Sequence, residues 1–349
     1  MSILNTRLQN FRDNYEGGPD HFEDRFSRYG TFEAFKSDTM SVDTILTPKL
    51  LNDITSSFNT PVQYPVIDRG NIPVTAVRNV NITDFFSDTQ LVTANFVTLV
   101  SEFTMDPAAY VENYVGYEQD FNRNMVRVIR GLSEAIETQA AATLDANINQ
   151  FFPAATFVYP DVANAFQVPL AEHDNAYNQL GSIMNIMDYY GDMNVVASTA
   201  HRTIVDRFRQ QGSGNATNLG WQYAGYNWFL SNSVSKTAAA QSTAYVMPKG
   251  TIAIAGRVDN SAKLGWEWAD GVGSELTTTV LPMLGETLPV AAYYTKNVAN
   301  RSAIAGAATA GDTRAMREGF QFSLDVCFLV AYNSDPVNTY SPVVKVDFL

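Results

Sequence analysis

The sequence predicts an α+β fold that is extended rather than compact, and three observations support this. The segment 120–150 has the apolar spacing of one long helix. Segments rich in β-branched and aromatic residues cover much of 60–105 and 320–330. Beyond Pro169, short helical and strand patterns alternate as in a compact α/β unit. A single helix of roughly 45 Å is typical of thin, plate-like proteins more than of enzyme domains.

The helix over 120–150 is the strongest local signal. Steps of three and four place its apolar residues on one stripe, namely Met125, Val128, Ile129, Leu132, Ala135, Ile136, Ala140, Leu144, Ile148 and Phe151. Gly131 weakens the helix by about 1 kcal/mol relative to alanine. Phe152-Pro153 is expected to end it, because the residue before a proline avoids the α conformation.

The charged residues of this helix are expected to lie away from the apolar stripe. Glu134 and Glu137 are assigned to the solvent side. Arg123, Arg127 and Arg130 form a basic row at i, i+4 and i+7. A solvated or salt-bridged face is the favoured interpretation of this row, and contact with nucleic acid is the alternative.

Residues 1–60 are expected to form an extended arm with short helical pieces. Their aromatic residues alternate with charges, and these are Phe11, Phe22, Phe26, Phe32 and Phe35. Gly17-Gly18-Pro19 interrupts any longer helix. Two interpretations stay open: a packed terminal subdomain, or an arm whose aromatic side chains dock on a neighbouring chain.

The segment 61–105 is predicted to be a long, twisted, two-stranded hairpin. Ala94–Phe103 and the residues around Arg78–Ile82 are β-branched and partly alternating. Prolines early in this stretch exclude a central strand there. Because an isolated hairpin is marginally stable in water, one that projects from a domain needs another surface to lie on.

The rest of the chain is predicted to alternate between helices and strands. The helices are Asn175–Tyr190 and His201–Gln211. The strands are Asn194–Ala197, Gly220–Val234, Ala244–Val258, Phe320–Val330 and Pro342–Leu349.

Composition and charge exclude several classes of protein. The chain has 349 residues, 46% of them hydrophobic and 17% charged, and its formal net charge is −13. This charge argues against a dedicated reader of DNA. The single cysteine, Cys327, excludes a disulfide framework and a cysteine zinc cluster, and it is interpreted as a small core residue. No apolar run is long enough to span a bilayer, and the first ten residues are too polar for a signal peptide.

No residue is predicted to be catalytic, to bind a cofactor or to ligate a metal. His21, His173 and His201 form no local pair at metal-ligand spacing. A catalytic triad that the fold assembles around His173 or His201 stays open. Glu267 and Asp270 are the other candidates, because paired acids beside aromatic residues are typical of sugar-cleaving sites.

Trp266 and Trp268 flank Glu267, so the alternative function is a carbohydrate-active hydrolase. The favoured interpretation of this segment is a packed loop or an interchain contact. The two acids are close in sequence, whereas glycosidases place theirs on opposite sides of the scissile bond.

Taken in order, these elements resemble the major capsid proteins of tailed double-stranded DNA bacteriophages, which share the Hong Kong 97-like capsid fold. Phe96–Phe103, followed by Asp106-Pro107, resembles the family's run from its E-loop hairpin into its spine helix. The resemblance implies an N-terminal arm over 1–60, an E-loop over 61–105, a peripheral domain over 106–170 and 311–349 with the spine helix at 120–150, and an axial domain over 171–310.

The resemblance also implies a structural protein and not an enzyme. Such a chain would self-assemble as hexamers and pentamers into an icosahedral shell around double-stranded DNA, without sequence-specific binding, cofactor or membrane. Its partners would be further copies of itself, with a scaffold, a portal and minor or decoration capsid proteins. It would be assembled in the host cytoplasm and reside in the virion. An encapsulin-like compartment, which carries protein cargo instead of DNA, is the second alternative.

Overall fold

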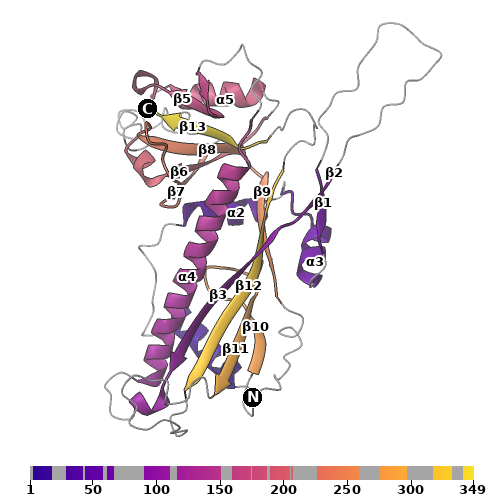
Figure 1. Cartoon of the computed structure of the whole chain (residues 1–349), viewed down its shortest axis with the longest axis vertical. Helices are drawn as coiled ribbons and strands as arrows, with labels where there is room; N and C mark the ends of the chain where they lie inside the picture. Colours follow the sequence, from indigo (N-terminus) through magenta and orange to yellow (C-terminus); the bar gives the residue numbers. More distant parts are fainter. Residues whose placement is uncertain are drawn as a thin grey trace, which may run out of the picture.

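The structure is a computed structural model that describes residues 3–17, 29–41, 44–57, 61–66, 90–110, 116–150, 159–173, 175–186, 189–204, 206, 226–258, 275–296, 317–331 and 341–349. Its body is elongated: the long helix α4 runs beside one sheet, and a second sheet lies across one end (Figure 1).

A five-stranded antiparallel sheet forms the long part of the body. Its strands are β3 (Phe96–Met105), β9 (Ile252–Arg257), β10 (Glu275–Thr279), β11 (Val290–Lys296) and β12 (Glu318–Val330). The order is β10-β11-β12-β3, and β9 pairs with the C-terminal half of β12. The central strand β12 has 13 residues and confirms the strand predicted at Phe320–Val330.

The predicted long helix is present as α4 (Tyr117–Ala146), which packs on β3 and β12. Its apolar stripe is buried from Met125 to Leu144, except for the half-buried Ala135. The predicted end at Phe152-Pro153 is wrong, because Asn147 leaves the helical conformation and Ile148 forms a β-bridge with Val343.

The assignment of Glu137 to the solvent side of α4 is also wrong. Its side chain is buried, 2% exposed, whereas Glu134 is exposed as predicted. The reason is a second helix, α2 (Gly30–Thr39), which packs across α4 at this point and offers hydrogen-bond donors to the carboxylate.

A six-stranded mixed sheet lies across the end of α4 (Figure 1). Its order is β4-β5-β13-β8-β6-β7, and its strands are β4 (Asp161–Val162), β5 (Ala165–Val168), β6 (Met193–Ser198), β7 (Tyr226–Ser231), β8 (Ser242–Pro248) and β13 (Val344–Phe348). Helix α5 (Ala176–Ile186) and this sheet share one apolar cluster. Two short 3-10 helices, η2 (Leu170–Glu172) and η3 (Thr199–His201), complete the unit.

The sheets divide the C-terminal half of the chain differently from the prediction. The segment Ala244–Val258 is two strands, because Gly250 turns the chain with a φ of 86°. Strand β8 stays in the six-stranded sheet, whereas β9, β10 and β11 join the five-stranded sheet, although they lie in the predicted axial range 171–310. The last strand, β13, was expected in the peripheral sheet and instead lies between β5 and β8.

Only part of the predicted hairpin over 61–105 is a two-stranded ladder. Strand β1 (Gln63–Val66) pairs with β2 (Gln90–Thr93), and β3 then leaves the ladder to pair with β12 along ten residues. Strand β3 alternates between a face packed on α4 and an exposed face, which makes it a good sheet strand. The residues around Arg78–Ile82 lie outside the described residues.

The N-terminal helices pack within the chain. They are α1 (Ile3–Gly17), α2 and α3 (Pro48–Ser56). Phe11, Phe32 and Phe35 are at most 3% exposed and belong to the main apolar core, as the packed-subdomain interpretation predicts. Phe22 and Phe26 lie outside the described residues.

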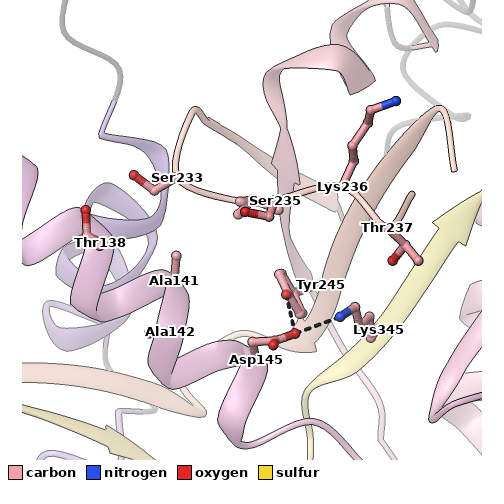
Figure 2. A pocket seen from close by; sticks show the side chains of 11 residues that line it. Thr138, Ala141, Ala142, Asp145, Ser233, Ser235, Lys236, Thr237, Tyr245 and Lys345 are labelled. Atoms are coloured by element: carbon pink, nitrogen blue, oxygen red, sulfur yellow. Dashed lines mark hydrogen bonds and ion pairs between the residues drawn. The ribbon is translucent and has the colours of Figure 1, made fainter. Parts of the chain in front are cut away.

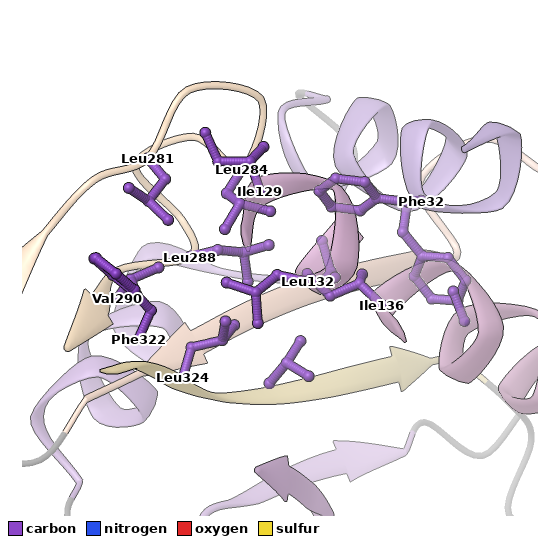
Figure 3. Packing of buried hydrophobic residues seen from close by; sticks show 14 of the residues in the cluster. Phe32, Ile129, Leu132, Ile136, Leu281, Leu284, Leu288, Val290, Phe322 and Leu324 are labelled. Carbon is purple, nitrogen blue, oxygen red and sulfur yellow. The ribbon is translucent and has the colours of Figure 1, made fainter. Parts of the chain in front are cut away.

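The main core lies between α4, α2 and the five-stranded sheet (Figure 3). Ile129, Leu132 and Ile136 of α4 face Phe322 and Leu324 of β12. Leucines before β11 close the core from the side. Each such buried side chain contributes about 1.5–3 kcal/mol, so this layer fixes α4 on the sheet. Within the described residues, no helix is long and apolar enough to cross a membrane.

Candidate functional site

A buried carboxylate joins α4, α2 and the six-stranded sheet. Glu137 accepts hydrogen bonds from the backbone N–H groups of Thr31 (3.1 Å) and Phe32 (2.7 Å), at the start of α2. The hydroxyl of Ser231, at the end of β7, donates to the same carboxylate. A negative charge at the N-terminus of a helix is favoured by its unpaired N–H groups and its dipole. The carboxylate therefore fixes the position of α2 on α4.

The start of α2 also approaches β7 more closely than a side chain would allow. A Cβ atom on Gly30 would lie 2.2 Å from the carbonyl oxygen of Leu230. Tyr29 forms a β-bridge with Ser231 beside this contact. Glycine is therefore required where α2 meets the six-stranded sheet.

A second buried carboxylate holds the other end of α2. Asp38 accepts from the backbone N–H of Gly250 (2.8 Å) and from the side-chain amide of Asn194 (2.5 Å). Gly250 is the turn between the two sheets, and Asn194 lies on β6. Burial raises the pKa of Asp38 to about 6, although these hydrogen bonds oppose the shift. Helix α2 thus connects α4 with both sheets.

Helix α1 is held at the far end of the body by charged side chains. The carboxylate of Glu275, on β10, accepts from the backbone N–H groups of Ile3 (3.1 Å) and Leu4 (2.8 Å), which caps the helix. Arg7 forms an ion pair with Glu318 of β12 at 2.8 Å. The guanidinium carbon of Arg7 also lies 4.6 Å from the centre of the Tyr117 ring, at the start of α4.

Glu318 collects three donors at this anchor. Arg7 and the hydroxyls of Tyr117 and Tyr294 all donate to its carboxylate. Burial alone would raise the pKa of Glu318, but these hydrogen bonds outweigh burial and hold the pKa below its usual value. The N-terminal helix is therefore joined to the first turn of α4 and to the central strand by one polar cluster.

The two-stranded ladder stands beside the C-terminal end of α4 and leaves a cavity there. The cavity has a volume of about 370–380 Å³ and is lined by Tyr64, Val92, Thr93, Ala94, Asn95, Val97, Ala142, Thr143, Ala146, Asn147, Phe328 and Val330. Leu91 of β2 is 63% exposed next to these residues in the chain. A ladder of four paired positions buries little surface, so its apolar residues remain available for contact.

Figure 2 shows a second cavity of about 370 Å³, between the end of α4, strands β8 and β13, and the loop 233–237. Asp145 accepts from Tyr245 and Lys345, each at 2.7 Å. Burial would raise the pKa of Asp145, but the bonds from Lys345 and Tyr245 hold it below its usual value. Its carboxylate is thus ionised and engaged, and no histidine or cysteine lines this cavity. The arrangement ties β13 to α4 and has no nucleophile–base pair.

The fold does assemble polar groups around His201, but as core packing. Its Nδ1 lies 2.8 Å from the hydroxyl of Ser242, and its Nε2 contacts the hydroxyl of Tyr177. His201 is fully buried, and burial, with a smaller effect of His173, lowers its pKa to about 3. It packs against Trp228 and Phe348, with ring centroids 5.8 and 4.7 Å away. A catalytic triad needs an orienting acid and access for substrate, and neither is present around His201 in the described part of the chain.

The other candidates give no site within the described residues. His173 is buried against Phe348. Among the described residues, no group of histidine, cysteine and acidic side chains could hold a metal ion. Glu267, Asp270 and their neighbouring tryptophans lie outside the described residues, as does His21. Cys327 is fully buried as predicted, and burial raises its pKa to about 12.

Sequence reasoning missed the two carboxylates that position α2. Glu137 is flanked on its helix face by Ser133, Ala140 and Ala141, all buried. Small residues one turn before and one turn after a charge indicate close approach of another element, and this signal could have revealed the contact. Asp38 carries no comparable local signal, because its partners lie 156 and 212 residues away.

Comparisons with known proteins find similarity of structure only. No protein-family model matches the chain, and no curated protein matches it by sequence. Among solved structures, one from Mycobacterium phage Che8 has a TM-score of 0.50 and 11% identity, covering 95% of this chain and 96% of that one.

Two further similar structures are titled as capsids. The capsid of Ralstonia phage GP4 has a TM-score of 0.48 and 10% identity over 95% of this chain and 96% of that chain. The capsid structure of the cyanophage P-SCSP1u has a TM-score of 0.48 and 10% identity over 84% of both chains. The predicted resemblance to a tailed-phage capsid protein is confirmed at the level of the fold, which this chain shares along nearly its whole length with the Che8 structure.

Proposed function

We propose that this chain is a major capsid protein that self-assembles as hexamers and pentamers into an icosahedral shell enclosing double-stranded DNA. In this proposal the chain has no turnover, and its work is the burial of surface between many copies. The single observation that carries the proposal is the elongated fold, a 30-residue helix on a long sheet with a second sheet at one end, which the Che8 phage structure shares.

The exposed area of the chain supports the proposal. The chain exposes 19418 Å², whereas a compact monomer of 38.5 kDa exposes about 14,000 Å². A chain with this excess gains stability when neighbours cover part of its surface. Exposed apolar side chains such as Leu91 on β2 and Val100 on β3 are suited to such contacts.

Electron microscopy of the purified chain tests the proposal. We expect rings, sheets or closed shells in negative stain, with hexameric and pentameric units resolved after class averaging. A chain that stays monomeric at high concentration, in microscopy and in sedimentation, would overturn it.

The contents of the particles separate this proposal from an encapsulin-like compartment. A capsid protein produced during phage infection should yield shells that contain nuclease-protected double-stranded DNA. Shells filled with a specific cargo protein would assign the same fold to a compartment instead. Release of sugar by the purified chain, abolished in Glu267→Gln, would favour the hydrolase.

A further inference from the structure

The elongated body has two broad faces. One is the outer side of α4, and the other is the side of the five-stranded sheet that α4 does not cover. Phe103 of β3 marks the covered side, because its ring stacks on Phe320 and meets Phe121 of α4 with ring centroids 5.0 and 5.8 Å away. Thr98 and Glu102 alternate with the covered positions and therefore lie on the open side.

The open side of the sheet is polar and has little net charge. Gln321 donates to Glu102 across the β3–β12 ladder at 3.2 Å. Thr98 donates to Asp325 at 2.6 Å, and Arg257 pairs with the same carboxylate at 3.3 Å. The positive charge of Arg257 is matched by Asp325, so Glu102 leaves this face slightly acidic.

The outer side of α4 carries the opposite charge along its middle. Arg123, Arg127 and Arg130 are all exposed, and successive members rise about 6 and 4.5 Å along the helix axis. Acidic residues on the same side lie beyond both ends of this row, at Glu118 and Glu134. The middle of the helix therefore presents three guanidinium groups in a line of about 10 Å.

We propose that the outer face of α4 is the surface that contacts packaged double-stranded DNA, with Arg123, Arg127 and Arg130 pairing with backbone phosphates. This inference rests on the proposed function. A chain with a net charge of −13 repels DNA on average, so the wall that meets the genome needs a locally positive face.

The composition of the same face favours DNA over a protein partner. No large apolar side chain is exposed on α4. Protein interfaces depend on buried aromatic and aliphatic anchors, whereas non-specific contact with DNA needs only cations that reach the phosphates. Guanidinium groups also bind phosphate in a bidentate manner.

Cysteine labelling of assembled shells tests which face is inside. The native Cys327 is fully buried, so a new surface thiol reacts above a low background. In intact shells, a maleimide on a polymer too large to enter should label Glu102→Cys but not Arg127→Cys. A small maleimide that enters the shell should label both. Labelling of Arg127→Cys by the large reagent, or its protection from both reagents, would overturn the inference.

A binding measurement with the unassembled chain tests the phosphate contacts. The variant Arg123→Gln, Arg127→Gln, Arg130→Gln is compared with wild type on a short DNA duplex between 50 and 200 mM salt. Loss of three contacts lowers the slope of log affinity against log salt by about 2.7. The salt sensitivity of the affinity over this range should therefore fall by about 40-fold.

The control variant, Lys49→Gln, Arg202→Gln, Lys249→Gln, makes the same change in net charge at exposed positions on other elements. It should keep the slope of wild type. An equal loss in the control, no DNA binding by wild type, or binding of an acidic peptide in preference to the duplex would overturn the inference. If wild type forms no shells at all, the proposed function fails, while the duplex measurement still decides the role of the arginine row.

Discussion

Two buried carboxylates, Glu137 and Asp38, hold the two ends of helix α2. The first accepts from the N–H groups of the helix start, and the second accepts from the turn at Gly250. Burying a carboxylate is costly unless donors surround it, and both of these are surrounded. The geometry where α4 meets the two sheets therefore depends on a small number of polar atoms.

Replacing Glu137 by alanine should lower the free energy of unfolding by about 3 kcal/mol, because it leaves buried N–H groups of Thr31 and Phe32 without an acceptor. Chemical denaturation of the unassembled variants measures this. Glu134→Ala, one turn earlier and exposed, should change stability by less than about 0.5 kcal/mol. Equal effects at the two positions would contradict the role of Glu137.

Two glycines should respond to alanine in opposite directions. At Gly30 a Cβ atom would meet the backbone of Leu230, so Gly30→Ala should destabilise the chain and loosen α2. At Gly131, on α4, nothing lies within 4 Å, so Gly131→Ala should stabilise the chain by about 1 kcal/mol. Thermal unfolding of both variants checks the pair, and a stabilising Gly30→Ala would refute the close contact.

Asp38 predicts a pH dependence with a definite sign. Its pKa is about 6 in the folded chain and about 3.9 when unfolded, so the folded state binds the proton more tightly. The stability that this group contributes is complete below pH 4 and is lost as the pH rises through 6. The unfolding free energy of wild type relative to Asp38→Asn should fall by about 3 kcal/mol between pH 4 and pH 7. A flat difference would contradict the buried position of its carboxylate.

Individual elements explain which parts of the fold the sequence could predict. Helix α4 and strand β12 have strong local periodicity, and both were located correctly within a few residues. The end of α4 was not, because its cause is a pairing of Ile148 with Val343, almost 200 residues away. Sheet membership of β9 and β13 was missed for the same reason: local pattern identifies a strand but not its partner.

The candidate site was less predictable than the elements. Charge on a helix usually indicates solvent, and Glu137 breaks that rule because α2 supplies donors from another part of the chain. The arginine row needed no such partner, so its exposure followed from helical spacing alone.

Removing the two-stranded ladder should abolish assembly without unfolding the body. Ala94 donates its backbone N–H to the carbonyl of Val62 at 2.8 Å, so a short glycine linker can replace residues 63–93. This excision spares β3, which belongs to the five-stranded sheet. We expect native-like circular dichroism and no shells in electron microscopy. Normal shells from the excised chain would show that the ladder is dispensable.

At the scale of the whole molecule, the large exposed area links stability to association. Contacts between copies stabilise only the folded chain, so the thermal midpoint should rise with protein concentration. Each 1 kcal/mol of association per chain raises the midpoint by about 2–4 °C. Differential scanning calorimetry over a concentration series measures this, with the ladder-excised chain as the control whose midpoint should stay constant. A constant midpoint for wild type would contradict assembly-dependent stability.

The pairing of β3 with β12 also determines how the body responds to tension. The ten paired positions extend along the body's long axis, and ladder hydrogen bonds run perpendicular to the strands. A pull along that axis therefore strains all of these bonds together, in shear, instead of peeling them open one at a time. A wall built from such units would stretch little under outward pressure from its contents, and it would fail first where copies meet.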